Sequence, residues 1–301
     1  MARSILHVDL NNFFASVAVL SHPEAAHHPM AVCGDAAQRH GIVLSKNQLA
    51  KNCGVKTAET IWQAKAKCHE LLIIPPDFKQ YTYYSRLAKA IYTQYTDLVE
   101  PFGIDEAWLD VTGSQHLFGT GAAIADAIRT KLKTELGLTA SVGVSFNKIF
   151  AKLGSDLKKP DATSIISEEN FRQLIWPLPV GDLLYVGKAT QRKLANRAIF
   201  TIGDLACRDP HALVLLLGKS GESLWQFANG LDTSPVAPSA THGPLKSISN
   251  STTTPRDLHC NNDVKIVFYS LAESVAARLR KRALKGRTLS ISIRTCDFDS
   301  I

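Results

Sequence analysis

The alternation of apolar and polar residues predicts a regular order of strands and helices in the first half of the chain. Short runs with alternating or β-branched residues fit strands, and apolar residues at helical spacing fit amphipathic helices. The expected elements are strands at 4–9, 99–103, 107–112 and 139–145, and helices at 80–98 and about 121–136. Their order is strand, helix, strand, strand, helix, strand.

This order is that of the ferredoxin-like unit, in which the first strand pairs with the third. The first strand ends in Asp9, which we expect to emerge at the sheet edge rather than to be buried. Asp105 and Glu106 stand at the tip of the hairpin between the second and third strands. The topology therefore predicts that these three carboxylates meet. Residues 11–74 form an insertion that is large enough for a small subdomain, which would act as a lid.

The second half of the chain has a different pattern of predicted secondary structure. After about residue 167, short helices alternate with Gly-containing turns, as in LPVGDLLYVGKAT (178–190). Such turns are typical of helix-hairpin-helix motifs, whose amides bind phosphates without reading bases; the alternative is a plain helical bundle. Residues 230–244 are rich in Pro, Gly and Ser, and we place a linker at 234–244. Residues 245–301 form a further piece.

Length and charge narrow the class of protein. A chain of 301 residues exceeds the usual domain size of roughly 100 to 200 residues, so we expect at least two domains. The formal charge is +7, and the segment 274–296 holds seven Lys and Arg residues and no acid, which favours a polyanionic partner. The six cysteines are scattered without CxxC pairs, and no apolar run is long enough to span a bilayer. We expect a cytoplasmic protein with reduced thiols.

Three converging acids have a specific chemical use. They can hold two Mg²⁺ ions roughly 3.5 to 4 Å apart, the arrangement that stabilises the attacking and leaving oxygens of a phosphoryl transfer. Each acid alone is more simply explained as an ordinary solvated turn residue. Their convergence at one sheet edge is what favours a metal site at Asp9, Asp105 and Glu106.

Four motifs carry a resemblance to a known family. HVDLNNFFASV (7–17), GIDEAWLDVTGS (103–114), TASVGVSFNKIFAKLGSDLKKPD (139–161) and LPVGDLLYVGKAT (178–190) resemble, in this order, the signatures of the Y-family translesion DNA polymerases. The DinB-like, polymerase IV group is the most similar, while Asn11 and Ala18 resemble the UmuC-type branch. Gln48 and Lys51 depart from the Tyr and Arg that DinB-like enzymes usually have there. A lysine cannot form the bidentate fork of arginine, so this departure affects the phosphate contacts.

The resemblance implies an α+β, multidomain, right-hand polymerase. It would have a ferredoxin-like palm at 1–10 and 75–166, small fingers at 11–74, a helical helix-hairpin-helix thumb at 167–233, and an incomplete little finger at 245–301. A little finger normally contains two strand-helix-strand halves, and the chain ends after about one of them. The chain is thus expected to be either truncated or naturally short.

The resemblance also implies roles for individual residues. The catalytic acids are Asp9, Asp105 and Glu106, and the carbonyl of Leu10 joins them as a metal ligand. Phe14 is the steric gate that excludes a 2′-hydroxyl; simple core packing is the alternative for this ring. The nucleotide-binding residues are Phe13, Phe14, Ser45, Lys51 and Lys159, and the DNA-binding residues are Gly187, Lys188, Arg278, Arg280, Arg282 and Arg287.

The expected function is low-fidelity, template-directed addition of dNTPs to a primer during DNA repair and the SOS response, without proofreading. The partners would be primer-template DNA, dNTPs, two Mg²⁺ ions with Mn²⁺ as a substitute, and a sliding clamp in a full-length form. The chain would act as a monomer away from membranes. Two alternatives remain: a catalytically silent DNA-binding accessory factor of the same superfamily, and a ferredoxin-fold nucleotide cyclase, which has no use for a helix-hairpin-helix thumb.

Overall fold

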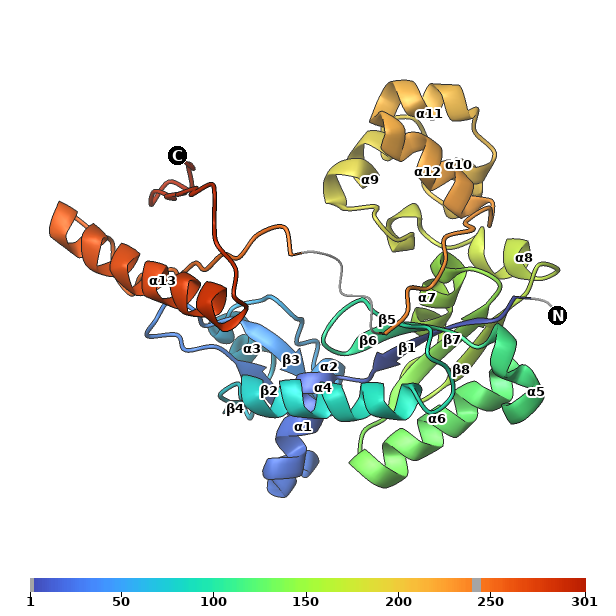
Figure 1. Ribbon diagram of the computed structural model, residues 1–301, viewed down its shortest axis with the longest axis horizontal. Coiled ribbons are helices and arrows are strands. Elements are labelled where there is room, and N and C mark those ends of the chain that lie inside the picture. Colours follow the sequence, from blue (N-terminus) through green and yellow to red (C-terminus); the bar gives the residue numbers. More distant parts are fainter. Residues whose placement is uncertain (1–2, 240–244) are drawn as a thin grey trace. The chain divides into compact units, whose positions relative to one another are not determined.

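The computed structural model describes residues 3–239 and 245–301 (Figure 1). The chain divides into two compact units, each built from two stretches of sequence. Unit 1 comprises Met1–His27 and Asp77–Thr241, and unit 2 comprises His28–Pro76 and His242–Ile301. The insertion predicted at 11–74 thus contributes its first part to unit 1, where α1 (Phe13–Ser21) packs against α4 (Phe78–Tyr92).

A five-stranded sheet forms the centre of unit 1. Its strands are β1 (Ile5–Leu10), β5 (Val99–Pro101), β6 (Glu106–Asp110), β7 (Ala140–Ser145) and β8 (Thr163–Ile166). They lie in the order β5-β6-β1-β7-β8, with β1 antiparallel to both neighbours and β8 parallel to β7. The predicted pairing of the first strand with the third is therefore confirmed, and the sheet gains β8 at one edge.

Helices cover both faces of this sheet, so every residue of β1 is buried. On one face lie α4 and α6 (Gly121–Leu136), which pack against each other (Figure 1). On the other lies α7 (Lys148–Leu157), which packs on β1, β7 and β8. Gly143 makes this close approach feasible, because a Cβ there would stand 1.9 Å from the carbonyl oxygen of Ala151. The odd-numbered residues of β1 face α7, as the contacts of His7 and Asp9 with that helix show.

Two predicted boundaries shift. The helix expected at 80–98 ends at Tyr92, because the next amides close tighter turns onto Ile91 and Tyr92. Tyr95 continues the helical spacing but is buried outside the helix, where its ring packs edge-on against Phe118. Glu106 is the first residue of β6 rather than part of the hairpin tip.

Short helices complete unit 1, and those after residue 167 agree with the prediction from the Gly-containing turns. They are α5 (Gln115–Phe118), α8 (Phe171–Ile175), α9 (Lys188–Ala195), α10 (Ile202–Ala206), α11 (Pro210–Leu217) and α12 (Lys219–Ala228), with 3-10 turns at Pro23–His27, Thr112–Ser114 and Val180–Asp182. A capping box between Thr201 and Asp204 fixes the start of α10. We call the helices α8 to α12 the helical lobe. They share one apolar core with α7.

The segment predicted as a linker at 234–244 is not a free linker over its described part. Val236 is 3% exposed and packs with Ile5 and Trp108. The amide of Ala237 donates to Glu100 Oε2 at 2.8 Å, and the amide of Ser239 donates to the carbonyl of Asp97 at 3.0 Å. The burial of Val236, which lies among Pro and Ser residues, holds this segment against the sheet. The rest of the predicted linker, 240–244, lies outside the described residues.

Unit 2 has a smaller sheet and one long helix. Its strands β2 (Met30–Cys33), β3 (Val43–Lys46) and β4 (Leu72–Ile74) lie in the order β3-β2-β4, and α2 (Gln48–Asn52) and α3 (Ile61–Lys67) accompany them. A small core of Ala, Val and Cys side chains holds them together. The C-terminal stretch contains α13 (Asn261–Lys281), whose residues are all partly or fully exposed.

The strands expected on either side of α13 are absent from the described residues of 245–301. The extended pairing there is short: an isolated bridge joins Arg294 and Ser300, and the backbones of Ile293 and Ile301 exchange hydrogen bonds of 3.0 and 2.9 Å. Leu289 and Ile291 have strand-like alternation, but they are exposed, because no neighbouring strand is present to accept their backbone hydrogen bonds. Within residues 3–239 and 245–301, no helix is long and apolar enough to cross a membrane.

Candidate active site

Strand pairing brings the three predicted acids together. Asp9 on β1 lies directly opposite Glu106 on β6, and the amide of Leu10 donates to the carbonyl of Asp105 at 3.1 Å. Directly opposed residues of an antiparallel pair have their side chains on the same face of the sheet. Asp9 and Glu106 therefore share the face that α7 covers, with Asp105 one residue before Glu106.

Asp9 is buried, which corrects the expectation that it emerges from the sheet. Its exposure is 7%. The strand continues to Leu10, and two lysines cover the carboxylate. Lys159 Nζ lies 2.5 Å from Asp9 Oδ2, and Lys152 Nζ lies 3.7 Å from the same oxygen. A buried carboxylate needs such partners, because desolvation of an unpaired charge is costly.

Lys152 on α7 also pairs with the neighbouring acid. Its Nζ lies 2.8 Å from Glu106 Oε1 and 3.6 Å from Asp156 Oδ2. Lys159 makes a second contact with Asp156, at 2.9 Å. Although burial lowers the pKa of each lysine, the carboxylates outweigh this effect and raise it above its ordinary value. Both ammonium groups are therefore charged and stand between the acids.

The two adjacent acids of the hairpin have opposite pKa shifts. Burial and the nearby charge of Asp9 raise the pKa of Asp105 to about 6. Burial would also raise the pKa of Glu106, but the interactions with His7 and Lys152 lower it to about 2. The phenol of Tyr92 is buried, and burial together with Asp9 and Asp105 raises its pKa. Negative charge is thus in excess around Asp105, and a further cation there would be stabilising.

The donor set fits divalent metal ions. Carboxylate oxygens are the ligands that Mg²⁺ prefers, and the site offers those of Asp9, Asp105 and Glu106 beside the backbone of Leu10. In the described part of the chain, no three His, Cys, Asp or Glu side chains already stand in a metal-binding arrangement. Lys152 and Lys159 occupy the space among the carboxylates instead, and their long side chains can withdraw.

An aromatic cluster lies on α1 and α4. The rings of Phe14 and Tyr81 stack with centroids 4.1 Å apart and an interplanar angle of 11°. Phe14 is half-buried, and Phe78 packs edge-on against both rings. Phe13, by contrast, is 3% exposed, so its ring offers little surface to a nucleotide. The cluster holds the Phe14 ring in a fixed orientation at the start of α1.

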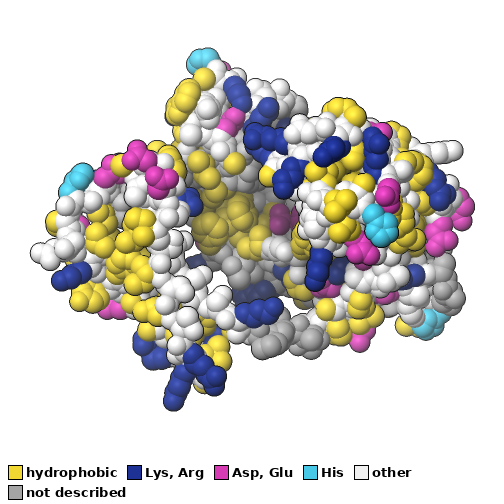
Figure 2. All heavy atoms as spheres, turned by 90° about the horizontal axis from the view of Figure 1, so that it is seen from above, with side chains coloured by type: hydrophobic (Ala, Val, Ile, Leu, Met, Phe, Trp, Pro, Cys, Tyr) yellow, Lys and Arg dark blue, Asp and Glu magenta, His cyan; other side chains and the backbone are white. Residues whose placement is uncertain are grey.

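The remaining predicted residues are distributed over both units. In unit 2, Ser45 lies on β3, Lys51 is exposed on α2, and the four predicted arginines lie at or after the last turn of α13; these are Arg278, Arg280, Arg282 and Arg287. In unit 1, Gly187 is the N-cap of α9 and Lys188 its first residue, both exposed. Figure 2 shows Lys and Arg side chains gathered over the helical lobe. Exposed basic residues of the lobe include Lys188, Arg192, Lys193, Arg197, Arg208 and Lys219.

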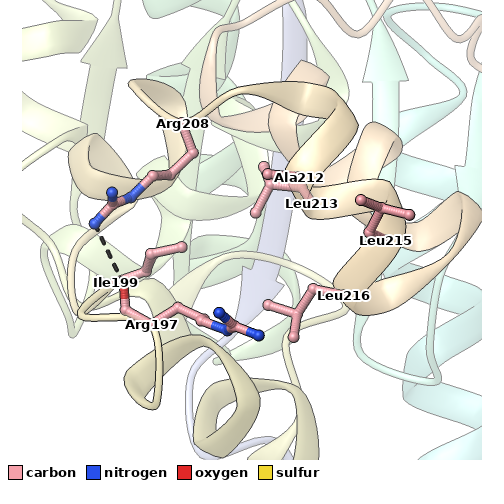
Figure 3. Close-up of a pocket in the computed structure, with 7 residues that line it drawn as sticks. All are labelled: Arg197, Ile199, Arg208, Ala212, Leu213, Leu215 and Leu216. Atoms are coloured by element: carbon pink, nitrogen blue, oxygen red, sulfur yellow. Dashed lines mark hydrogen bonds between the residues drawn. The ribbon is translucent and has the colours of Figure 1, made fainter.

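A cavity of about 550 Å³ also lies on the helical lobe (Figure 3). Its walls are Leu and Ile side chains with two arginines, and Arg208 Nη2 donates to the carbonyl of Arg197 at 3.3 Å. No carboxylate, hydroxyl or histidine lines it. It therefore has no chemistry comparable to that of the carboxylate site.

Two residues of the site are missed when the sequence is interpreted alone. Lys152 lies within the motif 139–161, four residues before Asp156, which is about one helical turn. That spacing is a signal that could have identified Lys152. His7 stands two residues before Asp9 on an alternating strand and so faces the same side, but nothing in the sequence distinguishes it from a core residue.

The chain is similar in sequence to known proteins over its whole length. The sequence model of the impB/mucB/samB family matches residues 8–156, and that of the family's C-terminal domain matches residues 245–301. A protein of Acetivibrio thermocellus named DNA polymerase IV is 56% identical over all of this chain and 75% of its own length. DNA polymerase IV 1 of Bacillus subtilis is 40% identical, again over all of this chain and 72% of its own length.

Solved structures have the same fold. A Y-family DNA polymerase chimera, Dbh-Dpo4(243-245)-Dbh, has a TM-score of 0.86 over 99% of this chain and 86% of its own, at 22% identity. DinB from Sulfolobus solfataricus has a TM-score of 0.70 over 77% of this chain and 69% of its own, at 26% identity. The fold is that of a nucleotide-polymerising enzyme, and the chain belongs to the impB/mucB/samB family, the Y family of DNA polymerases. It is a DinB-like member of that family, and a DNA-directed DNA polymerase.

Proposed function

We propose that this chain adds dNTPs to a primer 3′ end on a DNA template, with two Mg²⁺ ions held by Asp9, Asp105, Glu106 and the carbonyl of Leu10. The observation that carries the proposal is that Asp9 on β1 lies opposite Glu106, the first residue of β6, with Asp105 directly before it. Divalent metal ions are used by polymerases of this family, and Mn²⁺ would substitute for Mg²⁺. When bound, they would activate the primer hydroxyl and neutralise the triphosphate.

The protein's own residues have separable tasks in this scheme. Asp9 and Glu106 would release Lys152 and Lys159 as the metals and triphosphate enter, because both lysines are flexible cations that can follow a phosphate. Lys159 would then bind phosphate oxygens. Lys51 is proposed as a phosphate contact from the family resemblance alone. The enclosed surroundings of Asp9 strengthen each of these electrostatic interactions, since water is partly excluded from them.

We assign the domains of a right-hand polymerase to this chain on the strength of the family relationship. Residues 1–10 and 75–166 would be the palm, 11–74 the fingers, 167–233 the thumb and 245–301 an incomplete little finger. Ternary complexes are recorded for Dbh, a polymerase to which this chain is similar at 26% identity with a TM-score of 0.72. Primer-template DNA and dNTPs are accordingly the proposed partners, and a sliding clamp and a monomeric state remain predictions.

Primer extension on damaged and undamaged templates tests the proposal directly. Incorporation that requires both template and divalent metal would support it. Binding of DNA without incorporation, under any metal, would instead favour the silent accessory factor. No specific observation favours that alternative, because all three acids are present and converge.

Replacing Phe14 by Ala should raise ribonucleotide incorporation relative to deoxynucleotide incorporation. The ring is apolar, half-exposed and held by stacking on Tyr81, so it can exclude a 2′-hydroxyl without offering it a hydrogen bond. We expect a change in the ratio of roughly 10-fold or more, because one lost steric contact of about 1.4 kcal/mol corresponds to that factor. Single-nucleotide insertion of matched rNTP and dNTP measures this ratio.

Phe78→Ala, which removes a ring packed on Phe14 only edge-on, is the control. If the ratio of ribonucleotide to deoxynucleotide incorporation is unchanged in Phe14→Ala, the ring serves only in packing.

Neutralising arginines of unit 2 should weaken DNA binding in a salt-dependent way. Arg280 and Arg282 lie at the end of α13 and form no ion pair among the described residues. If each contacts one phosphate, the slope of log affinity against log salt should fall by roughly 0.9 per contact on duplex DNA. Titration of fluorescent primer-template at several salt concentrations with Arg280→Ala and Arg282→Ala measures the slope. Arg256→Ala, whose guanidinium is paired with Asp263 at 2.8 Å, is the control. Slopes equal to that of the unmutated chain would exclude a phosphate contact.

A further inference from the structure

His7 is a fully buried polar residue that the proposed chemistry does not use. It has 0% exposure and lies between α7 and Trp108, with ring centroids 5.3 Å apart in an edge-on arrangement. Nδ1 lies 2.9 Å from Ser155 Oγ. Nε2 is buried and has no hydrogen-bond partner within 3–239 and 245–301. A buried polar atom without a partner is costly, so its retention here calls for a physical reason.

The unpartnered nitrogen faces one of the proposed metal ligands. Nε2 of His7 lies 3.7 Å from Glu106 Oε2, the oxygen that Lys152 does not bind, since Lys152 Nζ lies 2.8 Å from Oε1. This separation is too long for a hydrogen bond, but a small rotation of the Glu106 side chain would close it. Lys152, whose side chain is flexible, thus binds Oε1 of Glu106. The buried imidazole of His7 lies near the other oxygen, Oε2.

The hydrogen bonds of Ser155 determine which tautomer suits this position. Its hydroxyl has one hydrogen, which can be donated either to the carbonyl of Lys152, at 2.7 Å, or to His7 Nδ1. In the first case the proton of His7 is on Nδ1, and a bare Nε2 lone pair faces a carboxylate oxygen, which is repulsive. In the second case Nε2 has the proton and donates it toward Glu106. The carbonyl of Lys152 lies inside α7 and can keep its helical amide partner, so the second arrangement satisfies more groups.

We infer that His7 is a positioning residue, which donates its Nε2 proton to Glu106 Oε2 and orients that carboxylate toward a divalent metal. The hydroxyl of Ser155 fixes the tautomer by donating to Nδ1. When Lys152 withdraws, His7 remains as the partner that keeps the Glu106 side chain from rotating away. Hydrogen-bonded partners of metal ligands have this effect in general, and their loss costs roughly 10- to 100-fold in metal affinity or activity. Burial lowers the pKa of His7, which agrees with a neutral ring in this role.

Three variants separate this role from simple packing. His7→Gln can place an amide N–H near the position of Nε2, whereas His7→Asn is shorter and can replace only the contact of Nδ1 with Ser155. Ser155→Ala keeps the imidazole but removes the hydroxyl that sets its tautomer. The measurement is Mn²⁺ binding by electron paramagnetic resonance, with matched dNTP and a primer-template that ends in a dideoxynucleotide, so that no turnover occurs. Mg²⁺ dependence of kcat and thermal unfolding are recorded alongside.

We expect His7→Asn to weaken Mn²⁺ binding about 10-fold or more, Ser155→Ala to weaken it less, and His7→Gln to stay within about 3-fold of the unmutated chain. Equal binding by all variants would overturn the inference. So would an equal loss in His7→Asn and His7→Gln, because that would indicate a packing role alone. The inference rests on the proposed metal site. If the unmutated chain itself binds no Mn²⁺, the proposed function fails; if Glu106→Gln loses Mn²⁺ and His7→Asn does not, only the role of His7 fails.

Discussion

Primer extension should be abolished when Glu106 is replaced by Gln, while affinity for primer-template DNA stays nearly unchanged. The substitution keeps the size of the side chain and removes the charge that a metal needs. The loss in kcat should be roughly 10³-fold or more, because a metal ligand contributes several kcal/mol to the transition state. Single-turnover extension and fluorescence anisotropy measure the two quantities separately.

Glu135→Gln is the matched control, since Glu135 is an exposed acid on α6, 3.9 Å from Lys131, in the same unit. It should extend primers like the unmutated chain. Substantial extension by Glu106→Gln would refute the site. A parallel loss of DNA affinity would mean that this acid acts through the duplex rather than through the metal.

Replacing Asp105 by Asn should remove activity and yet stabilise the metal-free protein. Burial and the charge of Asp9 raise the pKa of Asp105 to about 6 from an ordinary value of 3.8, so the folded chain resists ionisation of this group. The folded chain binds the proton of Asp105 more tightly than the unfolded chain, so protonation favours folding, and this stabilisation is lost as pH rises from about 4 to about 6. Above that range the buried ionised carboxylate lowers the free energy of unfolding of the unmutated chain by on the order of 2 kcal/mol. Asn has no charge and avoids this loss.

The melting temperature of Asp105→Asn in chelator should therefore exceed that of the unmutated chain at pH 7.5, by on the order of 5 °C. The two should converge near pH 4, where Asp105 is protonated. Excess Mg²⁺ should stabilise the unmutated chain and leave Asp105→Asn nearly unaffected. A lower melting temperature for Asp105→Asn at pH 7.5, or a difference that does not change with pH, would contradict the electrostatic origin of the shift.

The sequence predicts the carboxylate site because topology follows from element order. Strand and helix patterns alone place Asp9 opposite the hairpin that contains Glu106, and pairing of β1 with β6 confirms this. Lys159 is expected from the family resemblance as a triphosphate contact; the structure places it 2.5 Å from Asp9, which does not test that role. These residues stand next to strong local signals, a buried strand end, a hairpin and an Asp-rich motif, so that few arrangements are compatible with them.

Properties that depend on several elements together were not predicted. Burial of Asp9 requires α7 and two lysines that lie more than 140 residues later. The orientation of His7 depends on Ser155, which is 148 residues away. In the C-terminal stretch the local alternation around Ile291 favours a strand, but a strand needs a hydrogen-bonding neighbour, which the described residues do not supply. Tertiary partners decide these cases, and local patterns do not contain them.

The segment at 236–239 lies beside β5, an edge strand of the five-stranded sheet. An exposed edge is a template for pairing with other chains and hence a hazard for aggregation. Here Ala237 and Ser239 donate their amides to Glu100 and Asp97, on and just before β5, and Pro101 removes one further donor from that edge. The segment at 236–239 thus covers this edge of the sheet. A chain that ended before Val236 would leave the edge strand β5 exposed, and copies of such a chain could aggregate by pairing at this edge.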